Sequence, residues 1–504
     1  MKKAVACFLV CILLLFPLPR AGMAESTRSD SFPSLLPEAE TVLYVMPGGT
    51  STSCASWAEA CDLQTALNAA VAGDEVWVAQ GTYTPSTTNR NSFFTLHSGV
   101  AMYGGFTGTE TSLDQRDWVA NPTILSGEIG DPGSQTDNSV HILSAYNTNA
   151  DTLLDGFTIR DGYNTDDFAS GLYAMDSQAT FTHLLLTNNH ANQGGAVLFM
   201  NGSPKLTDST ISDNFATWGA GVYTASSSPT FTDLTIMNNT ASTQGGGIYN
   251  MNSNPTLTRV LLESNSTTES GGGVYSYGSN LVLTDVTFRD NQTSVKDDSV
   301  YNGGGGMFNF GPPNMVKVSV VLTNVTFTGN TSADDGGGLY NLRDVNTTMT
   351  NVTFTGNSAV RGGGFANTVV CSSVLNNVTI SDNTATNSGG AIHNESSVIW
   401  ATNTLVWGNS TPLVAVPGTT LSFSYSLVEG GCPALSGVSC SNLVTTNPLL
   451  QPLADNGGFT PTQALPAGSS AIDKGDPRLC PARDQRGYYR PINGDATPGA
   501  LCDI

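Results

Sequence analysis

A short motif recurs nine times through the middle of the chain and constrains the fold more than any other feature. It has the form large apolar-x-x-Asn, and a glycine cluster followed by an apolar residue comes a few residues later in eight of the nine copies. The repeated asparagines are Asn189, Asn214, Asn239, Asn265, Asn291, Asn330, Asn357, Asn383 and Asn409. Successive asparagines are 25 to 27 residues apart, apart from one interval of 39. A fixed period of this length indicates stacked units, because each unit is too short to bury a hydrophobic face alone.

The composition of one unit predicts strands and turns. The unit Gly245–Asn265 contains two β-rich runs, Ile248–Asn250 and Thr256–Leu262, separated by Asn, Ser and Pro. No unit shows ten residues of helical periodicity. The position after the glycines and the position three before each asparagine are apolar in every copy. We therefore expect an all-β parallel solenoid whose like residues stack inward, one per coil, at the spacing of hydrogen-bonded strands of about 4.8 Å.

The repeated glycines and asparagines have structural explanations. A tight turn needs positive φ or close backbone approach, which glycine supplies without steric cost. Stacked asparagine amides can hydrogen-bond along a ladder from one coil to the next. Because these residues recur in every coil, we interpret them as scaffold and not as catalytic groups.

The motifs resemble those of a known family. FRDN (Phe288–Asn291), two copies of FTGN (Phe327–Asn330 and Phe354–Asn357), GGAV (Gly194–Val197) and GGAI (Gly389–Ile392) are similar to the chlamydial-type polymorphic outer membrane protein repeat. The resemblance covers roughly residues 181–410 and implies a right-handed parallel β-helix.

The N-terminal region differs from the repeats. Lys2, Lys3, the apolar run Ala4–Leu15 and the small residues around Ala24 predict a secretory signal peptide over 1–24, followed by a flexible lead-in over 25–40. Residues 41–90 are expected to form a cap with one amphipathic helix, followed by the first strand, since apolar residues fall at helical spacing between Leu63 and Val71. The β-helix is expected over 91–425.

The C-terminal region, 426–504, resembles the choice-of-anchor Q module. The segments that carry the resemblance are Asn447–Pro477, Asp484–Pro491 and Cys502–Ile504. The resemblance implies an irregular module and attachment to the cell surface. The chain stops just short of the Gly-Ala-aromatic-Glu continuation usual for this module, which leaves the anchoring route open.

Cysteine spacing indicates an exported protein, and the net charge bears on its partners. Three cysteine pairs are candidate disulfides. Cys54 with Cys61 and Cys432 with Cys440 are close in sequence, and Cys480 with Cys502 brackets the basic C-terminal loop. Cys371 is left over and is expected to be buried. The net charge of −22 disfavours binding to nucleic acid and anionic membranes. No cysteine pair has the spacing of a zinc site, and neither a metal nor a cofactor is predicted.

One polar column bears on catalysis. It lies at the bend between the two strand runs of each unit and contains His183, Asp208, Asp233, Arg259, Asp285, Asn324, Asn351, Asn377 and Asn403. Adjacent coils would place Asp208 and Asp233 about 5 Å apart, near the carboxylate separation of a retaining glycosidase. The favoured interpretation is that Asp and Asn occupy this turn for their backbone bonding, with Arg259 relieving repulsion between the aspartates.

A second column is aromatic, and we call it the aromatic stripe. It consists of Tyr223, Tyr249, Tyr275, Phe308 and Tyr340. It alternates with the inward apolar column and should face outward. Stacked rings there could bind a sugar or could stabilise the sheet through contacts between coils, and the second use is favoured. The 39-residue coil places its extra length, 292–302 and 310–318, beside this stripe.

Together these features favour an exported, cell-surface-associated and non-catalytic β-helix protein with an adhesin-like role. We expect a monomer without a transmembrane span in the mature chain, whose partner is a glycan or a surface protein. The alternative is a polysaccharide-active β-helix enzyme, a lyase or a glycoside hydrolase, acting through Asp208 and Asp233 or through the loops of the 39-residue coil.

Overall fold

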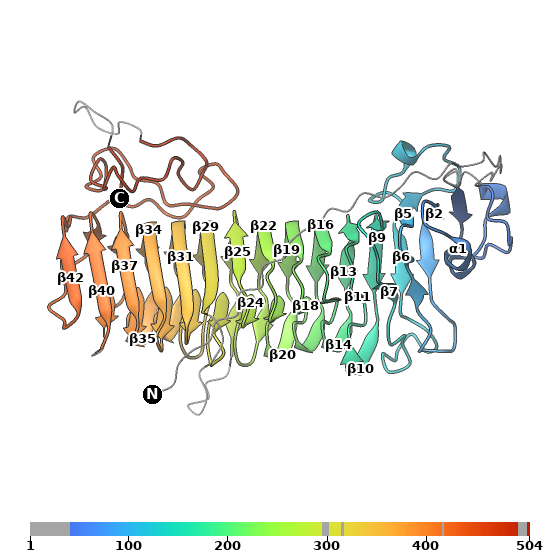
Figure 1. Cartoon of the computed structure of the whole chain (residues 1–504), viewed down its shortest axis with the longest axis horizontal. Helices are drawn as coiled ribbons and strands as arrows, with labels where there is room; N and C mark the ends of the chain where they lie inside the picture. The colour runs from blue at the N-terminus through green and yellow to red at the C-terminus, as the bar shows by residue number, and fades with distance from the viewer. Residues whose placement is uncertain (1–40, 295–301, 314–316, 416–417, 492–500) are drawn as a thin grey trace, which may run out of the picture. The chain divides into compact units, whose positions relative to one another are not determined.

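A computed structural model of the chain describes residues 41–294, 302–313, 317–415, 418–491 and 501–504. The expected signal peptide and lead-in lie outside these residues, as do parts of both segments of the 39-residue coil. The described strands pair in parallel from coil to coil and form a β-helix, which confirms the predicted fold class (Figure 1).

Three faces of the β-helix carry the strands. The largest sheet has 22 strands among the described residues. Its strands are β1 (Val42–Val45), β2 (Glu75–Ala79), β3 (Gly81–Tyr83), β5 (Ala101–Phe106), β6 (Thr123–Ser126), β8 (Leu153–Asp155), β9 (Phe157–Arg160), β12 (Thr180–Thr182), β13 (Leu185–Thr187), β16 (Lys205–Ser212), β19 (Thr230–Met237), β22 (Thr256–Glu263), β25 (Leu281–Thr284), β26 (Thr287–Arg289), β29 (Val318–Thr328), β31 (Val345–Thr355), β34 (Ser372–Ser381), β37 (Val398–Thr402), β38 (Leu405–Trp407), β40 (Thr420–Ser424), β41 (Leu427–Val428) and β42 (Val438–Ser441).

The second face follows the glycine clusters and the third follows the repeated asparagines. The second face contains β4 (Phe94–Thr95), β7 (Leu143–Tyr146), β11 (Leu172–Met175), β15 (Val197–Met200), β18 (Val222–Ala225), β21 (Ile248–Met251), β24 (Val274–Tyr277), β28 (Met307–Phe310), β30 (Leu339–Leu342), β33 (Phe365–Thr368), β36 (Ile392–Glu395) and β39 (Leu413–Ala415). The third face contains β10 (Tyr163–Phe168), β14 (His190–Gln193), β17 (Phe215–Trp218), β20 (Thr240–Gln244), β23 (Ser266–Thr267), β27 (Gln292–Thr293), β32 (Ser358–Arg361) and β35 (Thr384–Ser388).

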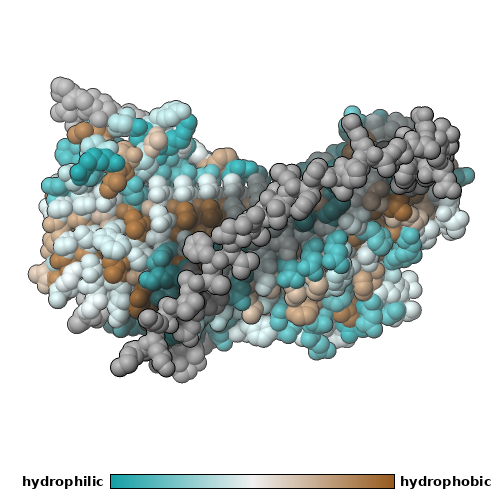
Figure 2. All heavy atoms as spheres, in the orientation of Figure 1, coloured by the Kyte–Doolittle hydropathy of each residue, from teal (hydrophilic) through white to brown (hydrophobic). Residues whose placement is uncertain are grey.

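The interior is a continuous stack of apolar side chains. The residues after the glycine clusters and those three before each asparagine are buried in one core, as their periodicity predicts. Phe288, Phe327 and Phe354 stack face to face on successive coils, with ring centroids 4.6 and 4.7 Å apart. Figure 2 shows rows of like hydropathy along the coils of the C-terminal half, the surface counterpart of this stacking.

The asparagine ladder forms through all nine coils. The side-chain amide of every ladder asparagine except the last, Asn409, donates to the Oδ1 atom of the next asparagine over 2.9–3.1 Å. The backbone N–H of the same residue donates to that oxygen as well. Because the ladder is buried, it satisfies polar groups that water cannot reach.

The glycines act as predicted. The first glycine of each cluster has positive φ, as at Gly271, where φ is 68°. The third glycine allows close approach between coils, because a Cβ atom on Gly247 would lie 2.6 Å from the carbonyl oxygen of Gly273.

The N-terminal cap contains the predicted helix, α1 (Leu63–Ala69). Asp62 caps it by accepting a hydrogen bond from the backbone N–H of Thr65. Leu63 and Leu67 face the core, whereas Val71 lies beyond the end of the helix and is half exposed. Two short 3-10 helices, η1 (Trp57–Glu59) and η2 (Leu113–Gln115), precede and follow α1 along the chain.

Parallel pairing continues beyond the expected end of the β-helix at residue 425. Strands β41 and β42 pair with β38 and β40, and Leu427 pairs with Val444. The last coil carries none of the asparagine and glycine signals. It forms nonetheless, because backbone pairing does not require the side-chain repeat. Within the described residues, the remainder of the C-terminal module, from 445 onward, lacks regular strands.

All three predicted disulfides are present, linking Cys54 to Cys61, Cys432 to Cys440 and Cys480 to Cys502. Cys371 is free and buried, and burial raises the pKa of its thiol to about 12. None of the described helices is long and apolar enough to cross a membrane.

Candidate functional site

The bend column is held in a backbone conformation that explains its composition. All nine residues, from His183 to Asn403, have φ between 46° and 58°, the left-handed region. Asn and Asp tolerate this region better than other non-glycine residues. The turn therefore accounts for the repeated Asp and Asn without any catalytic role.

The structure brings Asp208 and Asp233 to adjacent coils, as predicted. The register of β16 and β19 pairs the residues on both sides of these aspartates. Asp233 does not face Asp208 as a free carboxylate, because Arg259 on the next coil binds it through two nitrogens at 2.6 and 2.5 Å. The hydrogen bond from Arg259 lowers the pKa of Asp233, whereas a general acid needs a raised pKa.

The N-terminal end of the column is covered by the loop that joins β5 to β6. The Trp118 ring packs on His183 with centroids 4.3 Å apart. His183 and Arg116 both contact the carboxylate of Asp155, at 2.8 and 2.5 Å. His183 thus belongs to a packed polar cluster.

The C-terminal end of the column is covered by the C-terminal module. The Asn351 amide donates to the carbonyl oxygen of Arg483 over 3.0 Å and accepts from the guanidinium of Arg490 over 3.1 Å. The Asn377 amide donates to the carbonyl oxygen of Asp503 over 2.9 Å. An asparagine can both donate and accept here, which an aspartate cannot. This contact surface gives a reason for the change from mainly charged residues to Asn within the column.

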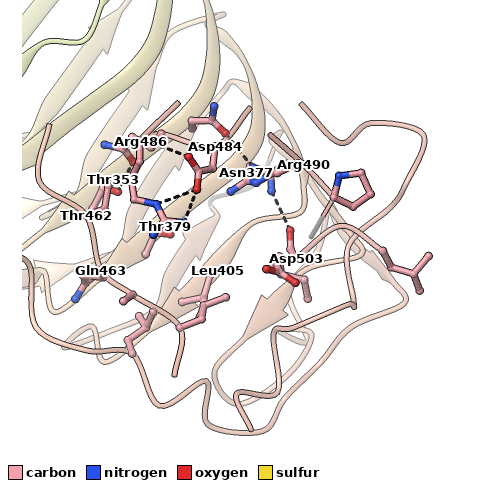
Figure 3. A pocket seen from close by; sticks show the side chains of 18 residues that line it. Thr353, Asn377, Thr379, Leu405, Thr462, Gln463, Asp484, Arg486, Arg490 and Asp503 are labelled. Atoms are coloured by element: carbon pink, nitrogen blue, oxygen red, sulfur yellow. Dashed lines mark hydrogen bonds and ion pairs between the residues drawn. The ribbon is translucent and has the colours of Figure 1, made fainter. Parts of the chain in front are cut away.

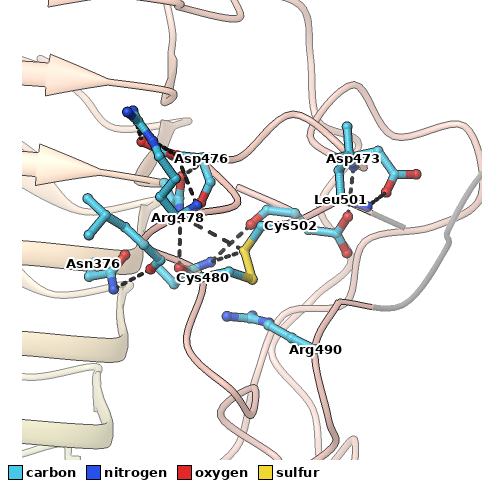
Figure 4. The surroundings of a disulfide bond; sticks show 12 residues. Asn376, Asp473, Asp476, Arg478, Cys480, Arg490, Leu501 and Cys502 are labelled. Atoms are coloured by element: carbon cyan, nitrogen blue, oxygen red, sulfur yellow. Dashed lines mark hydrogen bonds and ion pairs between the residues drawn. A yellow bond between two sulfur atoms is a disulfide. The ribbon is translucent and has the colours of Figure 1, made fainter. Parts of the chain in front are cut away.

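A second set of contacts fixes the module. The Gln485 amide donates to the Thr326 hydroxyl over 2.7 Å and accepts from the Thr353 hydroxyl over 2.9 Å. The Thr326 hydroxyl donates to the carbonyl oxygen of Pro461. Figure 4 shows the disulfide between Cys480 and Cys502 within the module, with Asn376 of the coils nearby.

A polar cavity of about 210 Å³ lies between the module and the coils (Figure 3). Its charged lining residues are Asp484, Arg486, Arg490 and Asp503. Arg486 is already paired with Asp484 at 2.6 Å. Burial lowers the pKa of Arg490 and raises that of Asp503. The balanced charges suit an interface cavity, and its lining residues also hold the module in place.

Five bend residues lie between His183 and Asn351, the bend positions that the two covers contact: Asp208, Asp233, Arg259, Asp285 and Asn324. We call them the open bend stretch. The Arg259 guanidinium lies 5.4 Å from the ring of Phe459, at the edge of the C-terminal module. The described residues contain no group of three or more His, Cys, Asp or Glu side chains able to hold a metal ion. Within the open bend stretch, Arg259 pairs with Asp233, and the Asn324 amide donates to Asp285.

The aromatic stripe is stacked as expected but is less accessible than an outward column suggests. Tyr223, Tyr249, Tyr275 and Phe308 stack face to face with centroids 4.8 to 5.1 Å apart, and Tyr340 meets Phe308 edge to face. Four of the five rings are buried, and Tyr249 is half-buried. Side chains of flanking columns pack beside them, including Met200, Tyr277 and Phe310. This packing favours the structural use of the stripe.

Sequence reasoning missed an ion pair on the third face, whose carboxylate is buried and whose guanidinium is partly exposed. The Asp335 carboxylate contacts Arg361 on the next coil at 2.6–2.7 Å. Burial raises the pKa of Asp335 to about 6 despite this guanidinium. The signal available in the sequence was the pair Asp334 and Asp335, which Arg361 follows one repeat period later.

Comparison with known proteins agrees with the fold. Residues 136–292 match the right-handed β-helix region, and 324–342 and 377–395 match the Chlamydia polymorphic membrane protein repeat. The chain is thus a right-handed parallel β-helix protein with polymorphic membrane protein repeats. A search of curated proteins finds no match.

Two solved structures are similar at low identity. The crystal structure of pectate lyase Pel9A is 13% identical, with a TM-score of 0.39 over 90% of this chain and 97% of that chain. The family 28 exopolygalacturonase of Yersinia enterocolitica is 11% identical, with a TM-score of 0.29 over 81% of this chain and 76% of that chain. Because both TM-scores are below 0.5, neither similarity bears on the activity of this chain.

Proposed function

We propose that the protein is an exported, cell-surface-associated β-helix that binds a glycan or a surface protein without chemical turnover, in the manner of an adhesin. The observation that carries the proposal is the two-point ion pair between Arg259 and Asp233. It occupies the carboxylate that the enzymatic alternative needs most. The buried asparagine ladder and the Asn351 and Asn377 amides are likewise engaged in structural contacts.

Three features support export and a surface location. The N-terminal sequence has the form of a signal peptide. The three disulfides suit an oxidising compartment. The matched repeats are named after a membrane protein of Chlamydia, and the C-terminal sequence resembles an anchoring module. A rigid stack of coils with disulfides at both ends can hold a binding surface in place outside the cell.

The proposal is tested by incubating the purified mature protein with a panel of neutral and acidic polysaccharides and with intact cells. We expect retention on at least one surface, with neither new reducing ends nor unsaturated sugars released. Product release that disappears in Asp233→Asn, while the variant keeps its circular dichroism spectrum, would overturn the proposal in favour of the enzyme.

Export is tested separately by cell fractionation with N-terminal sequencing of the recovered protein. We expect the protein outside the cytosol with residues 1–24 removed. Recovery in the cytosol with the N-terminus intact would contradict the surface role.

A further inference from the structure

An outward-facing column on the third face changes character along the β-helix. Parallel register aligns Tyr163, His190 and Phe215 with Thr240 and Ser266 on the coils that follow. The aligned positions on later coils are Gln292, Thr331, Ser358 and Thr384. Aromatic rings therefore occupy this column only on its first three coils.

The scaffold does not need aromatic rings at this position. On later coils polar residues fill it, mostly with hydroxyls, and the Oγ1 atom of Thr240 bonds to the Oγ atom of Ser266 at 3.0 Å. The neighbouring residues Ala191 and Ala216 are buried and face the interior, so the three rings point away from it. The β-helix therefore forms with either polar residues or aromatic rings at this position.

The three rings form one continuous group. His190 lies 4.8 Å from Tyr163 and 4.6 Å from Phe215, edge to face in both contacts. The Phe215 side chain remains 38% exposed. Burial lowers the pKa of His190, so its ring is neutral at pH 7. The group therefore presents an uncharged aromatic surface to solvent.

A depression of about 310 Å³ lies against two of these rings, those of His190 and Phe215. Besides His190 and Phe215 it is lined by Gln135, Asn188, Asn189 and Asp213. Asn188 and Asp213 sit at exposed turns with positive φ. Within the described residues, neither side chain makes a hydrogen bond, and the same holds for the Gln135 side chain. Amide and carboxylate groups beside an exposed ring are thus available to a ligand.

We propose that this depression is a binding subsite for a neutral sugar ring, an assignment that rests on the proposed binding function and gives it a location. One face of a sugar ring is apolar and packs on an aromatic ring, while its hydroxyls need donors and acceptors at the rim. The lining residues provide both. They include no Lys or Arg, and the carboxylate of Asp213 repels a uronic acid, so the site selects neutral over acidic sugars.

Binding of soluble hexasaccharides to the mature protein, measured by calorimetry, tests the site. Cellohexaose serves as the neutral probe and hexagalacturonate as the acidic probe. We expect cellohexaose to bind more tightly than hexagalacturonate. Phe215→Ala should weaken cellohexaose binding about tenfold, in line with the loss of one aromatic contact. Asp213→Ala should weaken it too, while preserving the circular dichroism spectrum.

Leu185→Ala is the matched control. Leu185 belongs to the same coil as His190, is 39% exposed and does not line the depression, so its loss should leave binding unchanged. Thr240→Tyr should instead tighten binding, because it adds a ring to the column on the next coil.

The assignment is wrong if neither hexasaccharide binds at millimolar concentration, if the acidic probe binds better, or if Phe215→Ala binds cellohexaose like the unmodified protein. Retention on cells or polysaccharides that persists in Phe215→Ala would leave the proposed function standing and remove only this site. If the unmodified protein is retained on none of the polysaccharides or cells, the proposed function itself is wrong.

Discussion

At the residue scale, the ladder shows how one side chain type serves a whole stack. The Oδ1 atom of Asn265 accepts from both the backbone N–H and the amide of Asn239, and its own amide donates to Asn291 and to the carbonyl oxygen of Ile236. No other uncharged side chain of this size combines an acceptor with two donors. The repetition of Asn is therefore a hydrogen-bonding requirement of the stack.

Replacing Asn265 with Ala should lower the free energy of unfolding by about 2–3 kcal/mol, because buried donors on Asn239 lose their acceptor. Urea denaturation followed by circular dichroism measures the change. The control is Asn254→Ala, since Asn254 is exposed and bonds only to another exposed side chain, Asn280. We expect less than about 1 kcal/mol there. Equal effects of the two substitutions would show that the ladder contributes no special stability.

The burial of Asp335, which pairs with Arg361, predicts a pH dependence of stability. Burial raises the folded-state pKa of Asp335 from 3.8 to about 6, so the folded state binds more protons than the unfolded state between these values. The contribution of Asp335 to the free energy of unfolding is thus larger near pH 4 and falls as pH rises to about 6. The fall is of the order of 3 kcal/mol.

Comparison with Asp335→Asn isolates this effect. Unfolding free energies of both proteins are measured at several pH values from 4 to 7. The difference between the unmodified protein and the variant should shift against the unmodified protein as pH rises. A difference that is constant over this range, or that shifts the other way, would contradict the raised pKa.

At the element scale, periodicity predicted the contacts within a coil and between neighbouring coils. It did not predict contacts between segments that are distant in sequence. The ladder, the positive-φ glycines and the three disulfides were all predictable, because each depends on residues one period apart or close in sequence. The docking of the C-terminal module on Asn351 and Asn377 was not. It joins segments more than 100 residues apart, and a local pattern carries no information on such pairing.

The candidate site was predictable only in part. Alternation placed the aromatic stripe outside the interior correctly, yet it could not predict burial by flanking columns such as that of Met200 and Tyr277. Asp208 and Asp233 were placed on adjacent coils correctly. Whether Asp233 is free for catalysis depends on the rotamer of Arg259, which sequence spacing does not determine. The group at Phe215 was missed because three aligned aromatic residues are too few to stand out as a column.

The module should loosen without unfolding the coils when Gln485 is replaced by Ala. Gln485 bonds Thr326 and Thr353 on the β-helix and Thr460 within the module, so three contacts disappear together. We expect faster hydrogen exchange in the module over 456–490 and unchanged exchange in β16, β19 and β22. Gln451→Ala is the control, because Gln451 is exposed and its side chain bonds only to nearby backbone. Unchanged exchange in Gln485→Ala would show that other contacts hold the module.

At the scale of the whole molecule, the coils behave as nearly equivalent layers, and each contacts mainly its two neighbours. Removing one complete layer should therefore leave the rest of the stack intact. The best layer to remove is 215–239, because Phe215 aligns with Thr240 and the deletion joins Asn214 directly to that position. The deletion also brings Asp208 next to Arg259, which replaces the lost pairing with Asp233.

We expect this 25-residue deletion to yield a folded, protease-resistant protein with cooperative thermal unfolding and a β-type circular dichroism spectrum. Its midpoint should decrease only modestly, since one layer and one interface are lost. A 12-residue deletion of 215–226 serves as the contrast. It shifts turn residues into strand positions, breaks the ladder at Asn214 and should abolish folding. If both deletions unfold, the layers are not interchangeable, and the stability of the stack depends on contacts between particular coils.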